Sequence, residues 1–142
     1  MDQLALDILL VEDNLAHQRI TEYALRHGAF PFQLHVVRDG QEALDYLYRR
    51  NAYAGPSAPV EPDIILLDLN LPRRDGREIL GIMKNDASLK HIPVIIVSTS
   101  DREEDVAYAF HTGAVAYISK SSGFDKFNEE LARISQYVRP GS

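Results

Sequence analysis

The chain has 142 residues, 45% of them hydrophobic and 25% charged. That length suits one ordinary globular domain and is short for two. The formal net charge is -6, and no cysteine occurs. The acidic balance, without a long cluster of Lys and Arg, argues against nucleic-acid binding, which depends on basic contacts to phosphates. The missing cysteines exclude disulfides and thiolate metal sites.

The N-terminal segment MDQLALDILLVEDN has no basic region before its apolar stretch, and acids interrupt that stretch. This pattern argues against a signal peptide. No apolar run approaches the roughly 20 residues that a membrane helix needs. We therefore expect a cytoplasmic protein that neither enters a membrane nor binds nucleic acid.

Short apolar runs recur along the chain, and such runs are typical of strands that a parallel sheet buries on both faces. The segment Gln33–Arg38 is expected to be a strand because polar and apolar residues alternate in it. The expected strands are Ile8–Val11, Gln33–Arg38, Ile64–Leu67, Pro93–Val97 and Ala116–Ser119. Helical patterns alternate with these runs. This alternation predicts one doubly wound α/β domain with a parallel central sheet and helices on both faces.

The expected helices are marked by capping residues and apolar stripes. The first spans residues 15–27 and is ended by Gly28 as a left-handed cap, the second is opened by Asp39 and Gly40, and the third follows Asp75 and Gly76. The fourth is capped by Asp101 and stopped by Gly113. The last helix carries an apolar stripe along one face, made of Phe124, Phe127, Leu131, Ile134 and Val138. The stretch from Asn51 to Pro62 is rich in Ala, Pro and Gly and is expected to be a long loop.

Polar residues stand at the carboxyl ends of the strands, where open parallel sheets bind ligands. Glu12 and Asp13 follow the first strand, Asp68 the third, Ser98 the fourth and Lys120 the fifth. Taken singly, an acid here often caps the next helix, and a lysine is often a solvated surface group. Three carboxylates at one edge repel one another, however, so together they indicate a neutralising cation.

The ligand chemistry of this edge favours Mg²⁺ over Zn²⁺, because the ligands are oxygens and no His or Cys stands at the strand ends. Mg²⁺ usually takes one or two protein carboxylates and bridges to a phosphate. Lys120 would pair with one phosphoryl oxygen, and the Ser98 hydroxyl would donate to another. The pattern thus predicts phosphoryl transfer to an aspartate nucleophile.

Four segments in series, ILLVEDN, DIILLDLNLPRRDG, PVIIVSTS and GAVAYISK, resemble the receiver domain of two-component response regulators. The resemblance spans residues 5–138. It implies a flavodoxin-like, CheY-like fold with strand order 2-1-3-4-5. Residues 139–142 are then expected to be a short C-terminal tail, with no output domain.

The resemblance implies that Asp68 is the phosphoacceptor. It makes Asp13 a direct Mg²⁺ ligand and Glu12 a ligand through water. Asn70, two residues past the acceptor, matches the position whose backbone carbonyl ligates the metal. The family is a class of signalling proteins rather than enzymes, although a receiver promotes its own Mg²⁺-dependent phosphorylation and dephosphorylation.

The resemblance also implies a switch. Ser98 matches the switch hydroxyl, Tyr117 the aromatic residue whose rotamer reports phosphorylation, and Lys120 the phosphoryl-binding lysine. Ser100 and Asn70 flank the approach of a hydrolytic water and should influence the phosphoryl lifetime. The family usually has a cis proline after the lysine, whereas this chain has Ser121. A cis bond before a residue other than proline costs about 2.5–4 kcal/mol, so we expect a trans bond.

The Lys-Ser pair, the loop at Asn51–Pro62 and the segment DLNLPRRDGRE look most like the stand-alone regulators of bacterial and cyanobacterial phytochromes. This likeness implies a sensor histidine kinase of the phytochrome type as phosphodonor. It also implies a homodimer through the face of the fourth helix, fifth strand and fifth helix.

Three other functions share parts of the pattern. A haloacid-dehalogenase-type phosphatase needs a second Asp two residues after its nucleophile, where this chain has Asn70. A flavodoxin-like FMN binder cradles a phosphate at its first loop, where Glu12 and Asp13 would repel it. The main alternative is a receiver-like interaction module that signals without phosphorylation. Such modules usually lack an acid, the acceptor or the lysine, and all of these are present here.

Overall fold

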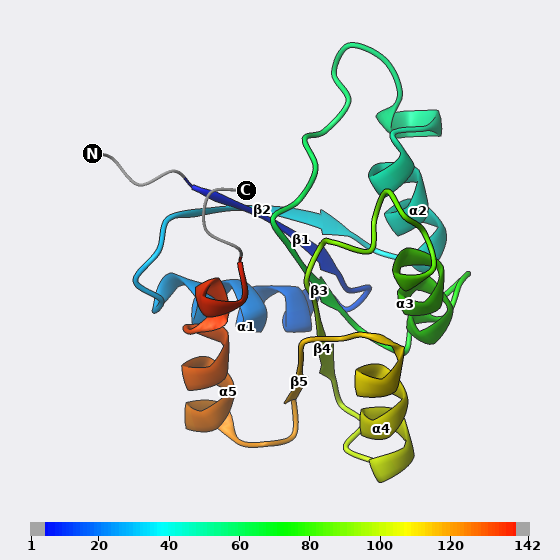
Figure 1. Ribbon diagram of the computed structural model, residues 1–142. Helices are drawn as coiled ribbons and strands as arrows, with labels where there is room; N and C mark the ends of the chain where they lie inside the picture. The colour runs from blue at the N-terminus through cyan, green and yellow to red at the C-terminus, as the bar shows by residue number, and fades with distance from the viewer. Residues whose placement is uncertain (1–4, 139–142) are drawn as a thin grey trace.

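The computed structural model describes residues 5–138 and contains a five-stranded sheet in the order β2-β1-β3-β4-β5. The strands are β1 (Leu6–Val11), β2 (Phe32–Val37), β3 (Ile64–Leu67), β4 (Val94–Ser98) and β5 (Ala116–Ser119). Every neighbouring pair is parallel. The predicted class, strand order and five strands are confirmed (Figure 1).

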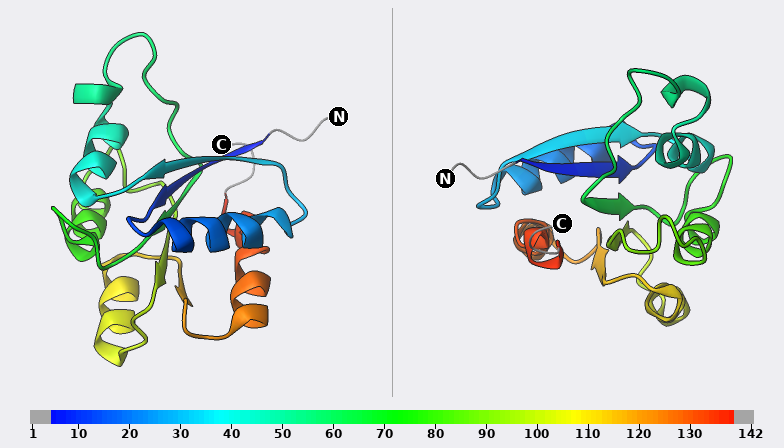
Figure 2. Two further views of the ribbon diagram at one scale, coloured as in Figure 1. Left: turned by 180° about the vertical axis from the view of Figure 1, so that it is seen from behind. Right: turned by 45° about the horizontal axis from the view of Figure 1, so that its top comes forward.

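The α-helices cover both faces of the sheet, as Figures 1 and 2 show. One face carries α1 (Leu15–Arg26) and α5 (Phe124–Leu131). The other face carries α2 (Gly40–Tyr48), α3 (Gly76–Lys84) and α4 (Glu103–Thr112). Two short 3₁₀ helices, Asn51–Tyr53 and Ile134–Tyr137, complete the described elements. None of the helices between residues 5 and 138 is long and apolar enough to cross a membrane.

Each face of the sheet has its own hydrophobic core. Leu9 and Val11 of β1 pack with buried side chains of α2, α3 and α4. Ile8 and Leu10, which alternate with them, pack with buried side chains of α1 and α5. Successive side chains of a strand point to opposite faces, so a run that is apolar at every position fills both cores. This explains why continuous apolar runs located the strands.

One of the two predicted aspartate caps, Asp39, is confirmed, and Asp75 caps the third helix as well. The Asp39 carboxylate accepts the amide of Glu42 at 2.7 Å, and the Asp75 carboxylate accepts the amide of Arg77 at 2.7 Å. The prediction that Asp101 caps the fourth helix is wrong. That helix begins two residues later, at Glu103, and its first turn is acidic, which suits the positive end of the helix dipole.

Gly28 does not form the predicted left-handed cap. Helix α1 ends at Arg26, its cap His27 has right-handed dihedral angles, and Gly28 is not among the glycines with positive φ. The glycine is needed for space instead, because a Cβ there would lie 2.6 Å from the Phe30 ring and 2.9 Å from the Ala132 carbonyl. A contact between distant segments therefore explains this residue.

The last helix is shorter than predicted. Helix α5 ends at Leu131, and Ile134 belongs to the separate 3₁₀ helix. Phe127, Leu131 and Ile134 are buried as the apolar pattern requires, but Phe124 is 65% exposed. The connection at residues 51–62 is irregular apart from its 3₁₀ turn. The expected tail at residues 139–142 lies outside the described residues.

Candidate functional site

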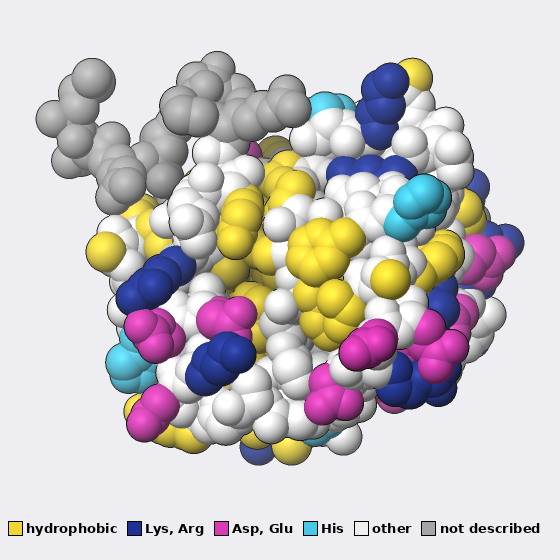
Figure 3. Space-filling view, turned by 60° about the horizontal axis from the view of Figure 1, so that its bottom comes forward, with side chains coloured by type: hydrophobic (Ala, Val, Ile, Leu, Met, Phe, Trp, Pro, Cys, Tyr) yellow, Lys and Arg dark blue, Asp and Glu magenta, His cyan; other side chains and the backbone are white. Residues whose placement is uncertain are grey.

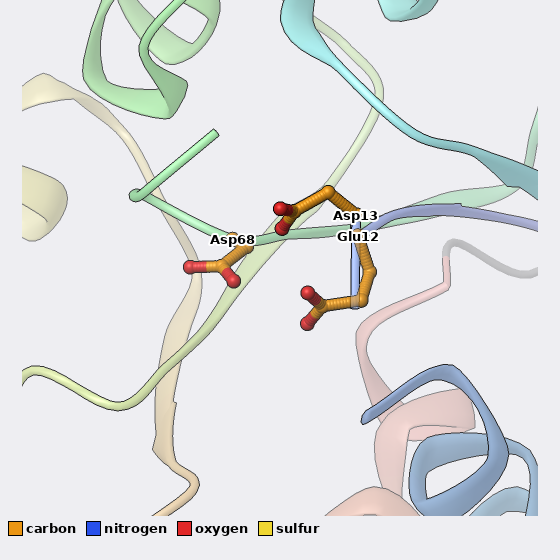
Figure 4. Close-up of side chains that lie close together, drawn as sticks. All are labelled: Glu12, Asp13 and Asp68. Atoms are coloured by element: carbon orange, nitrogen blue, oxygen red, sulfur yellow. The ribbon is translucent and has the colours of Figure 1, made fainter. Parts of the chain in front are cut away.

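Three carboxylates meet at the carboxyl edge of the sheet. Glu12 and Asp13 follow β1, and Asp68 follows β3, the neighbouring strand. Oxygen atoms from the three carboxylates lie within 4.8 Å of one another, and Figure 4 shows the side chains of Glu12 and Asp13 extending toward the side on which Asp68 lies. Glu12 and Asp68 are buried, whereas Asp13 is exposed. The parallel register thus brings together the three acids that the sequence singled out.

The predicted lysine joins this cluster. Lys120 follows β5, and its backbone amide donates to the Ser98 carbonyl at 2.8 Å, which extends the ladder between β4 and β5. Its ammonium donates to Asp68 Oδ2 at 3.0 Å and to Glu12 Oε1. The Lys120–Ser121 bond is trans, as predicted, since no described peptide bond is cis.

The charge of the cluster is only partly balanced. Burial raises the pKa of Glu12, and the hydrogen bond and charge of Lys120 offset that effect in part. A buried carboxylate keeps its charge more easily beside a second cation. The cluster therefore has the electrostatic character of a cation site.

The donor set fits Mg²⁺. Three carboxylates supply hard oxygen ligands, and one face is open through the exposed Asp13. Mg²⁺ needs few protein ligands because it keeps several of its waters. Glu12, Asp13 and Asp68 are the residues that would hold the ion, and their arrangement agrees with the sequence prediction.

The backbone around Asp68 fixes its carboxylate. The amide of Asn70 donates to Asp68 Oδ1 at 3.0 Å, a contact that the sequence analysis did not foresee. The Asp68 amide donates to the Val11 carbonyl at 3.2 Å. Gly76 at the start of α3 lies so close that a Cβ would be 2.0 Å from the Asp68 carbonyl. Gly76, which follows the N-cap Asp75 at the start of α3, is thus needed for the close approach of this helix to Asp68.

The predicted switch residues lie along one hydrogen-bonded path. Ser98 is fully buried, and its hydroxyl oxygen accepts the amide of Ser100 at 3.2 Å. The Tyr117 hydroxyl donates to the Ser100 carbonyl at 2.6 Å. The side-chain hydroxyl of Ser100 donates to Asp105 in the first turn of α4. Ser98, Ser100 and Tyr117 are thereby connected to α4 through the loop after β4.

Two further residues extend this arrangement, and sequence reasoning missed both of them. Arg77 of α3 donates to Asp105 Oδ1 at 2.8 Å, and this pair joins α3 to α4. His17 in the first turn of α1 places its Nδ1 3.1 Å from Lys120 Nζ. A side chain so soon after β1 had to lie near the carboxyl edge, and this was the available signal for His17. No spacing rule pointed to Arg77.

A groove of about 370 Å³ opens beside the lysine, between α1 and the segment that enters α5. Its wall is mixed, with polar side chains at Lys120 and apolar side chains farther along. The lining residues are His17, Ile20, Thr21, Thr99, Lys120, Ser121, Gly123, Phe124 and Phe127. The groove thus adjoins the carboxylate cluster through Lys120.

This fold, with an acidic cluster and a lysine at the carboxyl edge, defines a receiver domain. The sequence profile described as "Response regulator receiver domain" matches residues 8–132. The chain therefore belongs to the response-regulator receiver family, which is a family of signalling proteins.

Relatives within this family include a phytochrome response regulator. The chain is 40% identical over 114 residues to "Response regulator Rcp1" of Synechocystis sp., covering 80% of this chain and 76% of that protein. It resembles the "Phosphorylated Cyanobacterial Phytochrome Response Regulator RcpA" with a TM-score of 0.83 and 39% identity, covering 95% and 94% of the two chains. The "Mn(2+)-bound form of response regulator Rcp1" gives a TM-score of 0.83 and 34% identity, covering 96% and 97%.

Proposed function

We propose that this protein is a response regulator that accepts a phosphoryl group on Asp68 in a Mg²⁺-dependent reaction. The observation that carries the proposal is the contact of the Asp68 carboxylate with Lys120, at 3.0 Å, inside a cluster of three acids. RcpA, a phosphorylated structure by its description, and Rcp1, a Mn²⁺-bound one, are relatives that support it. In this role residues 5–138 act as one receiver domain.

The chain's own residues divide the work of the transfer. A carboxylate oxygen of Asp68 forms the bond to phosphorus while the bond from phosphorus to the donor's nitrogen breaks. Asp13, Asp68, the Asn70 carbonyl and, through water, Glu12 would hold Mg²⁺. Bound there, the ion supplies positive charge that offsets the phosphoryl oxygens. Lys120 binds a phosphoryl oxygen from the opposite side.

The switch would start at Ser98. In the structure the Ser98 hydroxyl oxygen accepts a hydrogen bond from the Ser100 amide at 3.2 Å. On phosphorylation the hydroxyl would turn to the phosphoryl oxygens, and this hydrogen bond would break. The loop after β4 follows, and the hydrogen bond from Tyr117 to Ser100 must change as the ring turns inward. This is a two-state element that new contacts bias toward one state. Ser100 and Asn70 would influence the phosphoryl lifetime, since they flank the approach of a hydrolytic water to Asp68.

The proposed phosphodonor is a sensor histidine kinase of the phytochrome type. The support for this choice is the likeness to Rcp1 and RcpA. The exposed apolar side chains of Ile20 and Phe124 on the groove beside Lys120 suit contact with such a partner. The exchange would take place in the cytoplasm. A homodimer through α4, β5 and α5 would carry the response, and its test is given in the Discussion.

The proposal is tested by intact-mass spectrometry after incubation with acetyl phosphate. Wild type is compared with Asp68→Asn, each with and without Mg²⁺. We expect a gain of one phosphoryl group that requires both the metal and Asp68. No gain in a folded wild-type protein would favour the alternative, an interaction module that signals without phosphorylation.

A further inference from the structure

The ammonium group of Lys120 has three hydrogens and meets three acceptors. Two are the carboxylates of Asp68, at 3.0 Å, and of Glu12. The third is Nδ1 of His17, at 3.1 Å. An ammonium group only donates, so Nδ1 must accept with its lone pair, and the ring proton lies on Nε2. His17 is thus the one acceptor of the three that is not a carboxylate.

From this arrangement we infer that His17 is a positioning residue, which keeps Lys120 directed at the phosphoryl site during transfer to Asp68. The inference rests on the proposed function. It adds a residue that supplies no oxygen to the cation site, although its Nδ1 lies 3.8 Å from Glu12 Oε1, and that acts through the lysine.

His17 is itself held in place by the start of α1. Its backbone amide donates to the Asn14 side chain at 3.0 Å, and Asn14 is the N-cap of the helix. The His17 side chain is 34% exposed, whereas the Lys120 side chain is 8% exposed. Both side chains line the groove beside the site. The capped helix therefore sets the ring against the lysine from the solvent side.

The contact matters because the other two acceptors are shared. Glu12 and Asp68 belong to the carboxylate cluster, so a divalent cation among these oxygens competes with Lys120 for them. Asp68 must also turn an oxygen to the incoming phosphorus. The hydrogen bond to His17 requires neither an oxygen that the cation takes nor the Asp68 oxygen that turns to phosphorus. It is the contact that persists while the lysine exchanges a carboxylate oxygen for a phosphoryl oxygen.

The inference is tested with variants that separate the acceptor from the bulk of the ring. His17→Asn keeps an acceptor close to the position of Nδ1, whereas His17→Leu keeps apolar bulk without an acceptor. Arg19→Ala, at an exposed position of the same helix, is the control. The initial rate of phosphorylation by acetyl phosphate is measured by intact mass at saturating Mg²⁺, and the Mg²⁺ Kd is measured by calorimetry.

We expect His17→Leu to slow phosphorylation by roughly five- to tenfold, which is the scale of one typical intramolecular hydrogen bond. His17→Asn should restore most of the rate, and Arg19→Ala should match wild type. The Mg²⁺ Kd should stay nearly constant across the set. In the metal-free protein, the Lys120 ammonium signal in a ¹H–¹⁵N NMR spectrum should weaken in His17→Leu through faster exchange and persist in His17→Asn.

The outcomes distinguish this role from the function on which it rests. No phosphorylation of wild type would overturn the proposed function and this role with it. Normal phosphorylation of wild type with an equal rate in His17→Leu would overturn the positioning role alone. Equal slowing in His17→Leu and His17→Asn would also overturn it, because the acceptor would then be irrelevant. A matching change in the Mg²⁺ Kd would assign the effect to metal binding instead.

Discussion

The hydroxyl of Ser98 is fully buried beside the site and has a partner in the loop after β4, the amide of Ser100. Ser98→Ala removes this acceptor and costs about 1 kcal/mol of stability, but it leaves the acids and Lys120 in place. We expect Asp68 to remain phosphorylatable while the response of Tyr117 is lost. The measurement is ¹⁹F NMR of protein labelled with 3-fluorotyrosine, with the signal assigned through Tyr117→Phe. If phosphorylation moved the Tyr117 signal of Ser98→Ala as far as that of wild type, the switch would be contradicted.

The charge of Asp13 should destabilise the metal-free protein. Its carboxylate lies within 4.8 Å of those of Glu12 and Asp68, so Asp13→Asn should raise the free energy of unfolding by about 1 kcal/mol without metal. At a Mg²⁺ concentration of a hundred times Kd, the free energy of unfolding of wild type should rise by about 2.7 kcal/mol, and that of the variant should rise much less. Urea unfolding with and without Mg²⁺ measures both effects, with Glu129→Gln as a control outside the cluster. Equal stabilisation of both proteins by Mg²⁺ would rule out the ligand role.

At the residue scale, the sequence predicted the acids and the lysine because strand ends are easy to locate and parallel strands share an edge. Asp13, Asp68 and Lys120 each directly follow a strand or are one residue beyond it. His17 and the Asn70 amide escaped prediction because their contacts depend on how a helix and a turn pack onto that edge. The role of Asn70 as a carbonyl ligand stays a prediction.

The element that joins the site to the surface is the loop after β4 with the first turn of α4. Asp105 is buried there, and the hydrogen bonds from Ser100 and Arg77 lower its pKa. A carboxylate with a lowered folded-state pKa stabilises the protein above the unfolded value of about 3.9, and this contribution is lost as the pH falls through the folded-state pKa. The stabilisation by Asp105 should therefore be full near neutral pH and vanish in acid.

Asp105→Asn should accordingly lower the free energy of unfolding by about 1–3 kcal/mol at pH 7. The difference from wild type should shrink steadily as the pH falls below about 4. Urea unfolding over a series of pH values measures it. Glu103→Gln, at an exposed position in the same helical turn, controls for the helix dipole. A difference that stayed constant with pH would mean that the charge of Asp105 is not the cause.

At the scale of elements, sequence reasoning located strands better than helix ends. The inner strands β1, β3 and β4 are apolar runs buried on both faces, so their signal is local. The ends of helices depend on distant partners instead. Gly28 is required by the closeness of Phe30 and Ala132, and the first turn of α4 is tied to α3 through Asp105 and Arg77. Neither contact could be derived from the capping preferences of single residues.

At the scale of the whole molecule, the phosphoryl site and the proposed response surface occupy different places. The site lies at the carboxyl edge of β1 and β3, whereas β5 is the last strand of the sheet and is flanked by α4 and α5. Figure 3 shows hydrophobic side chains gathered in the middle of one face, with acidic and basic side chains around them. The exposed apolar residues at α4 and before β5 include Phe110 and Val115. Under the proposed function, a chemical change at Asp68 would reach partners through the loop after β4.

Phe110 is the residue whose substitution tests this surface. It is 48% exposed. The hydroxyl of Tyr108, two residues earlier, donates to the Arg77 carbonyl of α3, so Phe110 lies on the side of α4 away from α3.

If the phosphorylated protein pairs through α4, β5 and α5, Phe110→Glu should weaken the dimer by at least roughly tenfold, since it would bury a charge in place of an aromatic contact. Sedimentation velocity with acetyl phosphate and Mg²⁺ measures the change, and intact mass verifies that Asp68 is still phosphorylated. Ile20→Glu, an equally exposed apolar position on α1, should leave the dimer intact. A dimer lost in Ile20→Glu and kept in Phe110→Glu would place the contact on α1 instead.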